Sequence, residues 1–149
     1  MSPALRETVG QEVWRRETLA KPTTEAARTA LAMNKRNLLA LYRGGAKIGF
    51  GTDSGATPLR LPGFAEHREL ILMVQAGLTP LQAINIATQK AALLLGLQDR
   101  GVLLSGKRAD FLVIDGAPDR SVSDIDLISQ VWQRGEPVSD GLVSKGNTP

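Results

Sequence analysis

One short stretch, residues 47–55, carries the residue types that could do chemistry. Ile48 and Phe50 alternate with small or polar residues, which is typical of a short strand with one apolar face. We predict a strand over residues 46–51 that ends in the turn-forming sequence Thr-Asp-Ser-Gly. Asp53 then follows the strand directly, and enzymes built from parallel strands place their catalytic groups there. The alternative interpretation is an Asx turn, in which Asp53 only closes the loop.

Two other features could carry function. His67 is the single histidine and lies in the next predicted helix; it contacts a substrate, or it is a rim histidine held by local hydrogen bonds. Residues 101–107 have the glycine and lysine spacing of a phosphate-binding loop. That loop requires Ser or Thr where this chain has Arg108, and a helix where it has an apolar strand pattern. We therefore exclude a nucleotide-binding loop.

Helices and strands alternate around these residues. Capping residues and apolar spacing predict helices over 12–20, from Pro22 to Gly44, from Phe64 to Gly77 and from Pro80 to Gly96. Thr24 and Glu25 mark the start of the second helix, and a Thr79–Gln82 capping box marks the last. Strands are predicted over 111–114 and 128–132, with a turn at 135–137.

Phe64, Trp14 and Trp132 are assigned to the core. Leu93, Leu94 and Leu95 are apolar on more than one helix face, so part of this leucine run should be exposed unless another segment covers it.

Composition limits the class of protein. The chain has 149 residues, 42% of them hydrophobic and 22% charged, as in globular proteins. The net charge of +3 is scattered, and aromatic residues make up only 4%, so nucleic-acid binding by base stacking is not expected. The absence of cysteine excludes disulfides and thiolate metal sites and fits a reducing, cytoplasmic compartment. No stretch approaches the ~20 apolar residues of a membrane span.

Three blocks of sequence together carry a family resemblance. They are Gly49–Gly55, His67–Thr88 and Leu95–Asp115, the last including Gly106-Lys107-Arg108-Ala109-Asp110. In this order and spacing, over about residues 44–135, they resemble the C-terminal third of the amidohydrolase superfamily, nearest to its imidazolonepropionase-like branch.

The resemblance implies an α/β fold, the C-terminal part of a (β/α)8 TIM barrel followed by strands of a small β-sandwich. Residues 46–51 would be the eighth barrel strand, and Pro3–Leu5 would lie at the end of the seventh. The implied division is a partial barrel over residues 1–100, sandwich strands over 101–138 and a disordered tail over 139–149.

The resemblance also implies a site. Asp53 would be a ligand of a divalent metal, commonly zinc, and would carry a proton from the attacking water to the leaving amine. Ser54, Gly55 and His67 would lie at the mouth that receives a small-molecule amide. The implied reaction is metal-dependent hydrolysis of non-peptide, cyclic-amide or dipeptide-like carbon–nitrogen bonds.

The chain lacks most of the implied ligands, because it has no His-x-His pair and only one histidine. A metal site built from N and O ligands normally needs three or more of them. We therefore expect the chain alone to bind no metal and to be inactive, and to need the missing N-terminal barrel segment or a homo-oligomer. The alternative is a truncated, non-catalytic remnant. A fold with residues 46–53 outside any parallel strand, and Asp53 in bulk solvent, would count against this lineage.

Overall fold

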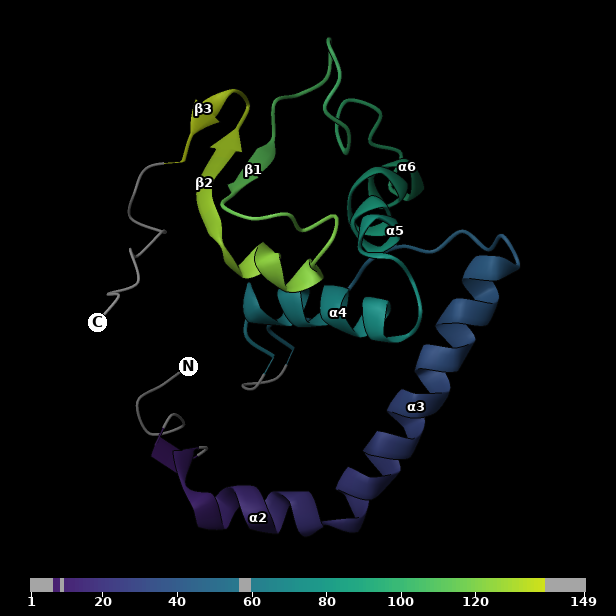
Figure 1. Cartoon of the computed structure of the whole chain (residues 1–149), viewed down its shortest axis with the longest axis vertical. Coiled ribbons are helices and arrows are strands. Elements are labelled where there is room, and N and C mark those ends of the chain that lie inside the picture. The colour runs from purple at the N-terminus through teal and green to yellow at the C-terminus, as the bar shows by residue number, and fades with distance from the viewer. Residues whose placement is uncertain (1–6, 9, 57–59, 139–149) are drawn as a thin grey trace.

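A computed structural model describes residues 7, 8, 10–56 and 60–138. The helices are α2 (Glu12–Ala20), α3 (Pro22–Arg43), α4 (Phe64–Gln75), α5 (Pro80–Asn85), the π-helical turn η1 (Ile86–Lys90), α6 (Ala91–Leu94) and the 3-10 helix η2 (Val122–Asp126). The strands are β1 (Phe111–Ile114), β2 (Ile128–Gln133) and β3 (Glu136–Pro137). Pro3–Leu5 and the predicted tail over 139–149 lie outside the described residues. Figure 1 shows α4 at the centre, with η2, the sheet and α5 on one side of it.

The predicted helices begin where the sequence placed them and end within about two residues of the predicted ends, but the one predicted from Pro80 to Gly96 is divided into α5, the π-helical η1 and α6. One capping prediction is also wrong. At the start of α5, Thr79 Oγ1 accepts from the Gln82 amide at 3.2 Å and Gln82 Oε1 accepts from the Thr79 amide at 2.9 Å. At the start of α3, by contrast, Lys21 is the N-cap residue and makes no side-chain cap. The Thr24 hydroxyl donates instead to the backbone carbonyl of Thr18, which ties α3 to the end of α2.

The predicted strand over residues 46–51 is absent from the structure. A barrel strand is held by hydrogen bonds to neighbours on both sides, and the described part of the chain offers this segment no such partner. The apolar alternation still has its expected effect, because Ile48 and Phe50 both pack against the hydrophobic core. The sequence pattern therefore located the two partly buried, core-facing side chains of the segment but not its hydrogen bonding.

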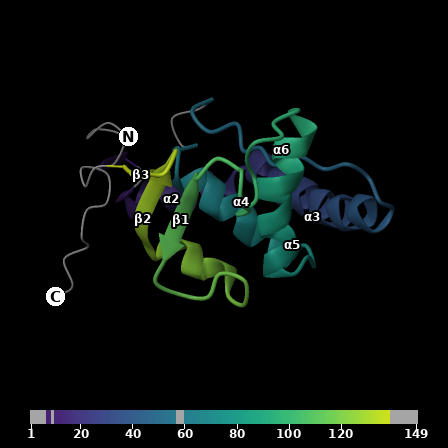
Figure 2. The same cartoon turned by 90° about the horizontal axis from the view of Figure 1, so that it is seen from above.

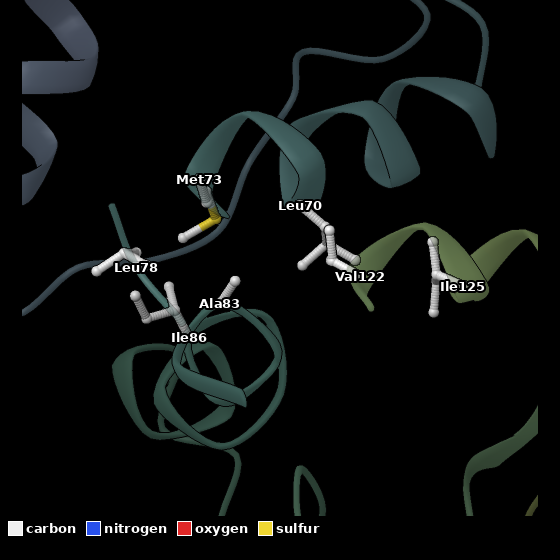
Figure 3. Close-up of a cluster of buried hydrophobic side chains, with 7 residues drawn as sticks. All are labelled: Leu70, Met73, Leu78, Ala83, Ile86, Val122 and Ile125. Carbon is white, nitrogen blue, oxygen red and sulfur yellow. The ribbon is translucent and has the colours of Figure 1, made fainter. Parts of the chain in front are cut away.

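The core joins both halves of the chain. Leu70 and Met73 on α4 meet Leu78, Ala83 and Ile86 from the following turn and helix, and Val122 and Ile125 from η2 (Figure 3). Ile86 is fully buried, with 0% of its surface exposed. The core thus contains residues from both sides of the proposed boundary near residue 101, and the division into two domains stays a prediction.

The described strands form one antiparallel sheet in the order β1-β2-β3, with an irregularity between Val113 and Ile114. Phe111 on β1 stacks on Trp132 on β2, with ring centroids 5.4 Å apart, but Trp132 is only partly buried and is not part of the buried core, so its assignment to the core is wrong. The turn lies at residues 134–135, one residue earlier than predicted, because residues 136–137 pair with β2. The two predicted strands are therefore confirmed, and the structure adds a short third one.

Helices α2 and α3 form an arm that is set apart from the rest of the molecule in Figure 1; seen from above in Figure 2, α3 projects beyond α5 and α6 while α2 lies behind the sheet and α4. Neither helix contains a buried residue, so the assignment of Trp14 to the core is wrong. Only the end of α3 packs on the core, through Leu38, Leu39 and Tyr42. No helix in the described ranges is long and apolar enough to cross a membrane.

Two predictions about exposure have opposite outcomes. Phe64, assigned to the core, is 67% exposed because it stands at the first position of α4, beyond the core-facing turns. Leu93, Leu94 and Leu95 are 64%, 55% and 72% exposed, which agrees with the expectation for a leucine run whose second face is not covered. Three large apolar side chains therefore remain exposed on α6 and the residue after it.

Candidate active site

Asp53 stands in a tight turn with an unusual backbone conformation. Its φ angle is +51°, in the left-handed region, where Asp and Asn are the residues other than glycine that are most easily tolerated. The Asp53 carbonyl accepts from the Ala56 amide at 3.0 Å. Thr52 Oγ1 accepts from the Ser54 amide at 3.2 Å, so Thr52 makes the side-chain-to-backbone contact of this turn. The Asp53 side chain contacts Arg60 instead.

The Asp53 carboxylate pairs with an arginine at the other end of the same loop. Asp53 Oδ2 lies 3.1 Å from Arg60 Nη1, and the two side chains are 82% and 51% exposed. The Gly55 amide donates to the Arg60 carbonyl at 2.7 Å and so holds the two ends of the loop together. An ion pair this open to water contributes about 1 kcal/mol or less to stability. Asp53 is thus accessible to a ligand.

A shallow pocket of about 420 Å³ lies beside this ion pair. Its lining includes Asp53 and Arg60 from the loop and Arg68 and Glu69 from α4. Burial raises the pKa of Glu69, which is half-buried. The pocket therefore presents carboxylate acceptors and guanidinium donors together, an arrangement suited to a small polar ligand.

Glu66, which sequence reasoning missed, holds the turn to α4. Glu66 Oε1 accepts from Thr52 Oγ1 at 2.7 Å, and Oε2 accepts from the Gly63 amide at 2.6 Å. Hydrogen bonds from the Ser54 side chain, the Thr52 side chain and the backbone lower the pKa of Glu66 to about 2. The available signal was its place three residues into a helix, the position of Gln82 in the capping box that the sequence did reveal.

His67 is placed away from Asp53. Its Nδ1 lies 2.7 Å from Asp126 Oδ1, which links α4 to η2, and its side chain is 28% exposed. It lines a different, largely apolar cavity of about 650 Å³ between α4, the sheet and η1, and it does not line the pocket at Asp53. This geometry agrees with the alternative of a histidine held by local hydrogen bonds, and its contact with a substrate stays a prediction.

The residues next to Asp53 do not fit a metal ion. Across the described ranges, no three His, Asp or Glu side chains lie close enough together to hold one. The group that the structure places on the Asp53 carboxylate is a guanidinium, whose positive charge opposes that of a cation. Asp53 could supply one ligand, and other ligands would have to come from elsewhere.

Comparison with known proteins assigns the chain to a family. The Amidohydrolase family model matches residues 14–146. The chain belongs to the amidohydrolase family. The match begins within α2 and includes all of α3, whereas the resemblance read from the sequence began only near residue 44. Amidohydrolases are generally metal-dependent hydrolases with a TIM barrel.

Individual relatives agree with this assignment. An imidazolonepropionase from Deinococcus deserti is 38% identical over 102 residues, which cover 66% of this chain and 25% of that protein. A 5-methylthioadenosine/S-adenosylhomocysteine deaminase from Bacillus cereus is 32% identical over 118 residues, 72% of this chain and 27% of that one. Among solved structures, a Xaa-Pro dipeptidase with methionine bound in its active site matches with a TM-score of 0.62 at 30% identity, over 72% of this chain and 25% of the dipeptidase.

The amidohydrolase match corrects one expectation. Residues 46–53 lie outside any parallel strand and Asp53 is 82% exposed, which the sequence analysis took as evidence against this family. That criterion was wrong. The chain spans about a quarter of the length of the relatives it matches, and strand pairing within a barrel cannot be judged from a quarter of one. The imidazolonepropionase-like character read from the sequence is confirmed.

Proposed function

We propose that this chain is the C-terminal segment of an amidohydrolase that hydrolyses carbon–nitrogen bonds, and that Asp53 is the catalytic carboxylate it contributes. The observation that carries the proposal is the family match over residues 14–146, within which Asp53 lines a polar pocket and is accessible. A deaminase and a dipeptidase each break a carbon–nitrogen bond, and both are similar to this chain. The substrate class we propose is a small amide or cyclic amide.

In this proposal residues 46–51 are the eighth strand of a barrel, and residues 101–138 supply strands to a small sandwich. The rest of the barrel, on an N-terminal segment or in a second copy of the chain, would provide the neighbouring strands. The exposed run Leu93, Leu94 and Leu95 supports this, because apolar surface of that extent is normally covered. An open groove of about 510 Å³ between residues 45–48 and α6 lies beside it.

Asp53 is proposed to accept a proton from the attacking water and to return it to the leaving amine. A carboxylate does this when it lies within hydrogen-bond reach of the reacting group, and the open pocket allows that approach. Ser54 and Gly55 would border the substrate on the loop side, and His67 on the helix side. A divalent metal, with zinc as our proposal, would take Asp53 as one ligand, but the described residues do not complete its site.

The alternative is a non-catalytic remnant of such an enzyme. Two observations favour it. The described residues do not complete a metal site, and the Arg60 guanidinium is paired with the Asp53 carboxylate that catalysis would use. The two proposals differ in whether the missing part of the barrel restores activity.

The decisive experiment adds that missing part. The segment encoded upstream of residue 1, or a neighbouring chain that carries a His-x-His pair, is mixed or co-expressed with this chain, and hydrolysis of small amides is measured with added Zn²⁺. We expect activity only in the mixture, and its loss in Asp53→Asn. Asp119→Asn is the matched control, because Asp119 is also an exposed aspartate but does not line the pocket.

Two results would contradict the proposal. Unchanged turnover in Asp53→Asn would remove Asp53 from the mechanism. Stoichiometric, tight Zn²⁺ binding by residues 1–149 alone, where we expect less than one equivalent, would show that the chain holds a complete metal site of its own.

A further inference from the structure

The turn that carries Asp53 is fastened on both of its sides by one side chain. Residue 52 bonds to Glu66 through its hydroxyl group, at 2.7 Å, and the Ser54 side chain also hydrogen bonds to Glu66. Asp53 lies between these two residues with a φ angle of +51°. A backbone conformation of this kind persists only when its surroundings hold it. Bonds within the loop close the turn, and Glu66 adds the contacts that tie it to α4.

The same carboxylate is anchored on the helix side. Glu66 Oε2 accepts from the Gly63 amide at 2.6 Å, at the point where α4 begins. Hydrogen bonds to an ionised acceptor are about twice as strong as those between neutral groups. The low pKa of Glu66, about 2, has the same origin, because every bond it accepts favours its charged form. The helix thereby becomes a fixed support for the turn.

We propose that Glu66 is the positioning residue for Asp53: by binding Thr52, Ser54 and the Gly63 amide together, it sets the direction of the Asp53 carboxylate. Its catalytic consequence rests on the proposed function of Asp53, whereas the geometry itself does not. Glu66 does not line the pocket at Asp53 and makes no hydrogen bond to Asp53 in the part of the chain that the structure describes, so its effect is carried through the residues on either side.

The test compares two residues at the third position of their helices, Glu66 and Gln82. Gln82 accepts from the Thr79 amide at the start of α5 as Glu66 accepts from Gly63 at the start of α4, but Gln82 has no bond to the loop. Glu66→Ala and Gln82→Ala therefore remove the same type of helix cap. Only the first should alter the turn. Backbone NMR of the full 149-residue chain reports the amide shifts of residues 52–55 and the φ-dependent coupling constant of Asp53.

We expect Glu66→Ala to change the Asp53 coupling constant and the shifts of Thr52 and Ser54, and Gln82→Ala to leave all of them as in the unmodified chain. Hydrogen exchange of the Gly63 amide should become at least about tenfold faster in Glu66→Ala, the effect of losing a hydrogen bond to a charged acceptor. Glu66→Gln keeps one acceptor oxygen, so it should retain part of the effect and show smaller changes.

A second variant changes the partner of Glu66, Thr52, and covers the case in which Glu66→Ala does not fold. Thr52→Val removes the hydroxyl that donates to Glu66 and accepts from the Ser54 amide, and it keeps the Glu66–Gly63 bond. It should therefore change Asp53 and Ser54 while Gly63 exchange stays within about twofold. If the Asp53 coupling constant is the same in Glu66→Gln, Thr52→Val and the unmodified chain, the proposal is refuted. These readouts need no activity, so a failure of the proposed hydrolase function would be seen separately.

Discussion

Replacing Gly101 by alanine tests the packing of the connection that leads from the helices to the sheet. Gly101 has a φ angle of +87°, and an added Cβ would lie 2.8 Å from the Cβ of Ala92. It would also lie 2.9 Å from the carbonyl oxygen of Thr88 and 3.1 Å from the Cα of Gln89. Backbone atoms in a packed helix cannot move aside as the end of a flexible side chain can. The substitution should therefore push the connection away from η1.

The expected loss has two parts. The left-handed conformation costs alanine about 1–2 kcal/mol. Overpacking against the helix backbone adds about 1–3 kcal/mol. Gly106→Ala is the matched control, because Gly106 has a similar φ of +80° but nothing within 4 Å of the added Cβ, so only the first part applies there.

Urea denaturation followed by circular dichroism measures both variants. We expect Gly101→Ala to lower the free energy of unfolding by about 1–3 kcal/mol more than Gly106→Ala does. Equal losses in the two variants would refute the reasoning, because they would show that the connection at Gly101 does not press on η1 in solution.

Two further predictions concern the core and the pH dependence of stability. Ile86→Ala should lower the free energy of unfolding by about 2–5 kcal/mol, because Ile86 is fully buried. In the same urea titration, the control Leu81→Ala should cost well under about 1 kcal/mol, because Leu81 is 62% exposed. Similar losses in the two variants would contradict the assigned core. Glu66 has a folded-state pKa of about 2, below its value of 4.5 in the unfolded chain, so its stabilising contribution is complete above about pH 4.5 and is lost as the pH falls toward 2. Thermal melts at several pH values between about 6 and 2 measure this. As the pH falls, the melting temperature should decrease less in Glu66→Gln than in the unmodified chain, and an equal decrease in both would contradict the prediction.

Local sequence signals predicted the elements that local forces determine. The α5 start was predicted because Pro80 and the Thr79–Gln82 box satisfy the first helical amides within a few residues. The strand β1 was predicted because four apolar residues stand between turn-forming sequences. By contrast, residues 46–51 have the composition of a strand, but a strand also needs a partner edge, which composition does not supply.

The candidate site was predicted in part for the same reason. Asp53 was found because it follows an apolar alternation and a turn signal, and Ser54 and Gly55 came with it. Arg60 and Glu66 were missed, because their contacts to Asp53 and Thr52 join residues seven and fourteen positions apart across a loop. Glu66 alone left a readable trace, since an acid three residues into a helix is a capping signal.

The arm formed by α2 and α3 has a consequence for how a complete enzyme would assemble. Val13, Leu19 and Met33 on this arm are 53%, 55% and 49% exposed, and neither helix buries a residue. Away from the end of α3 that packs on the core, such helices open locally at little free-energy cost, and a nine-residue helix such as α2 is marginal by itself in water. Docking of a complementary segment on the arm would then be coupled to its folding. The free energy needed to order these turns would lower the affinity between the arm and that segment. The heat-capacity change of binding would then include the folding of the arm as well as the burial of the contact surface.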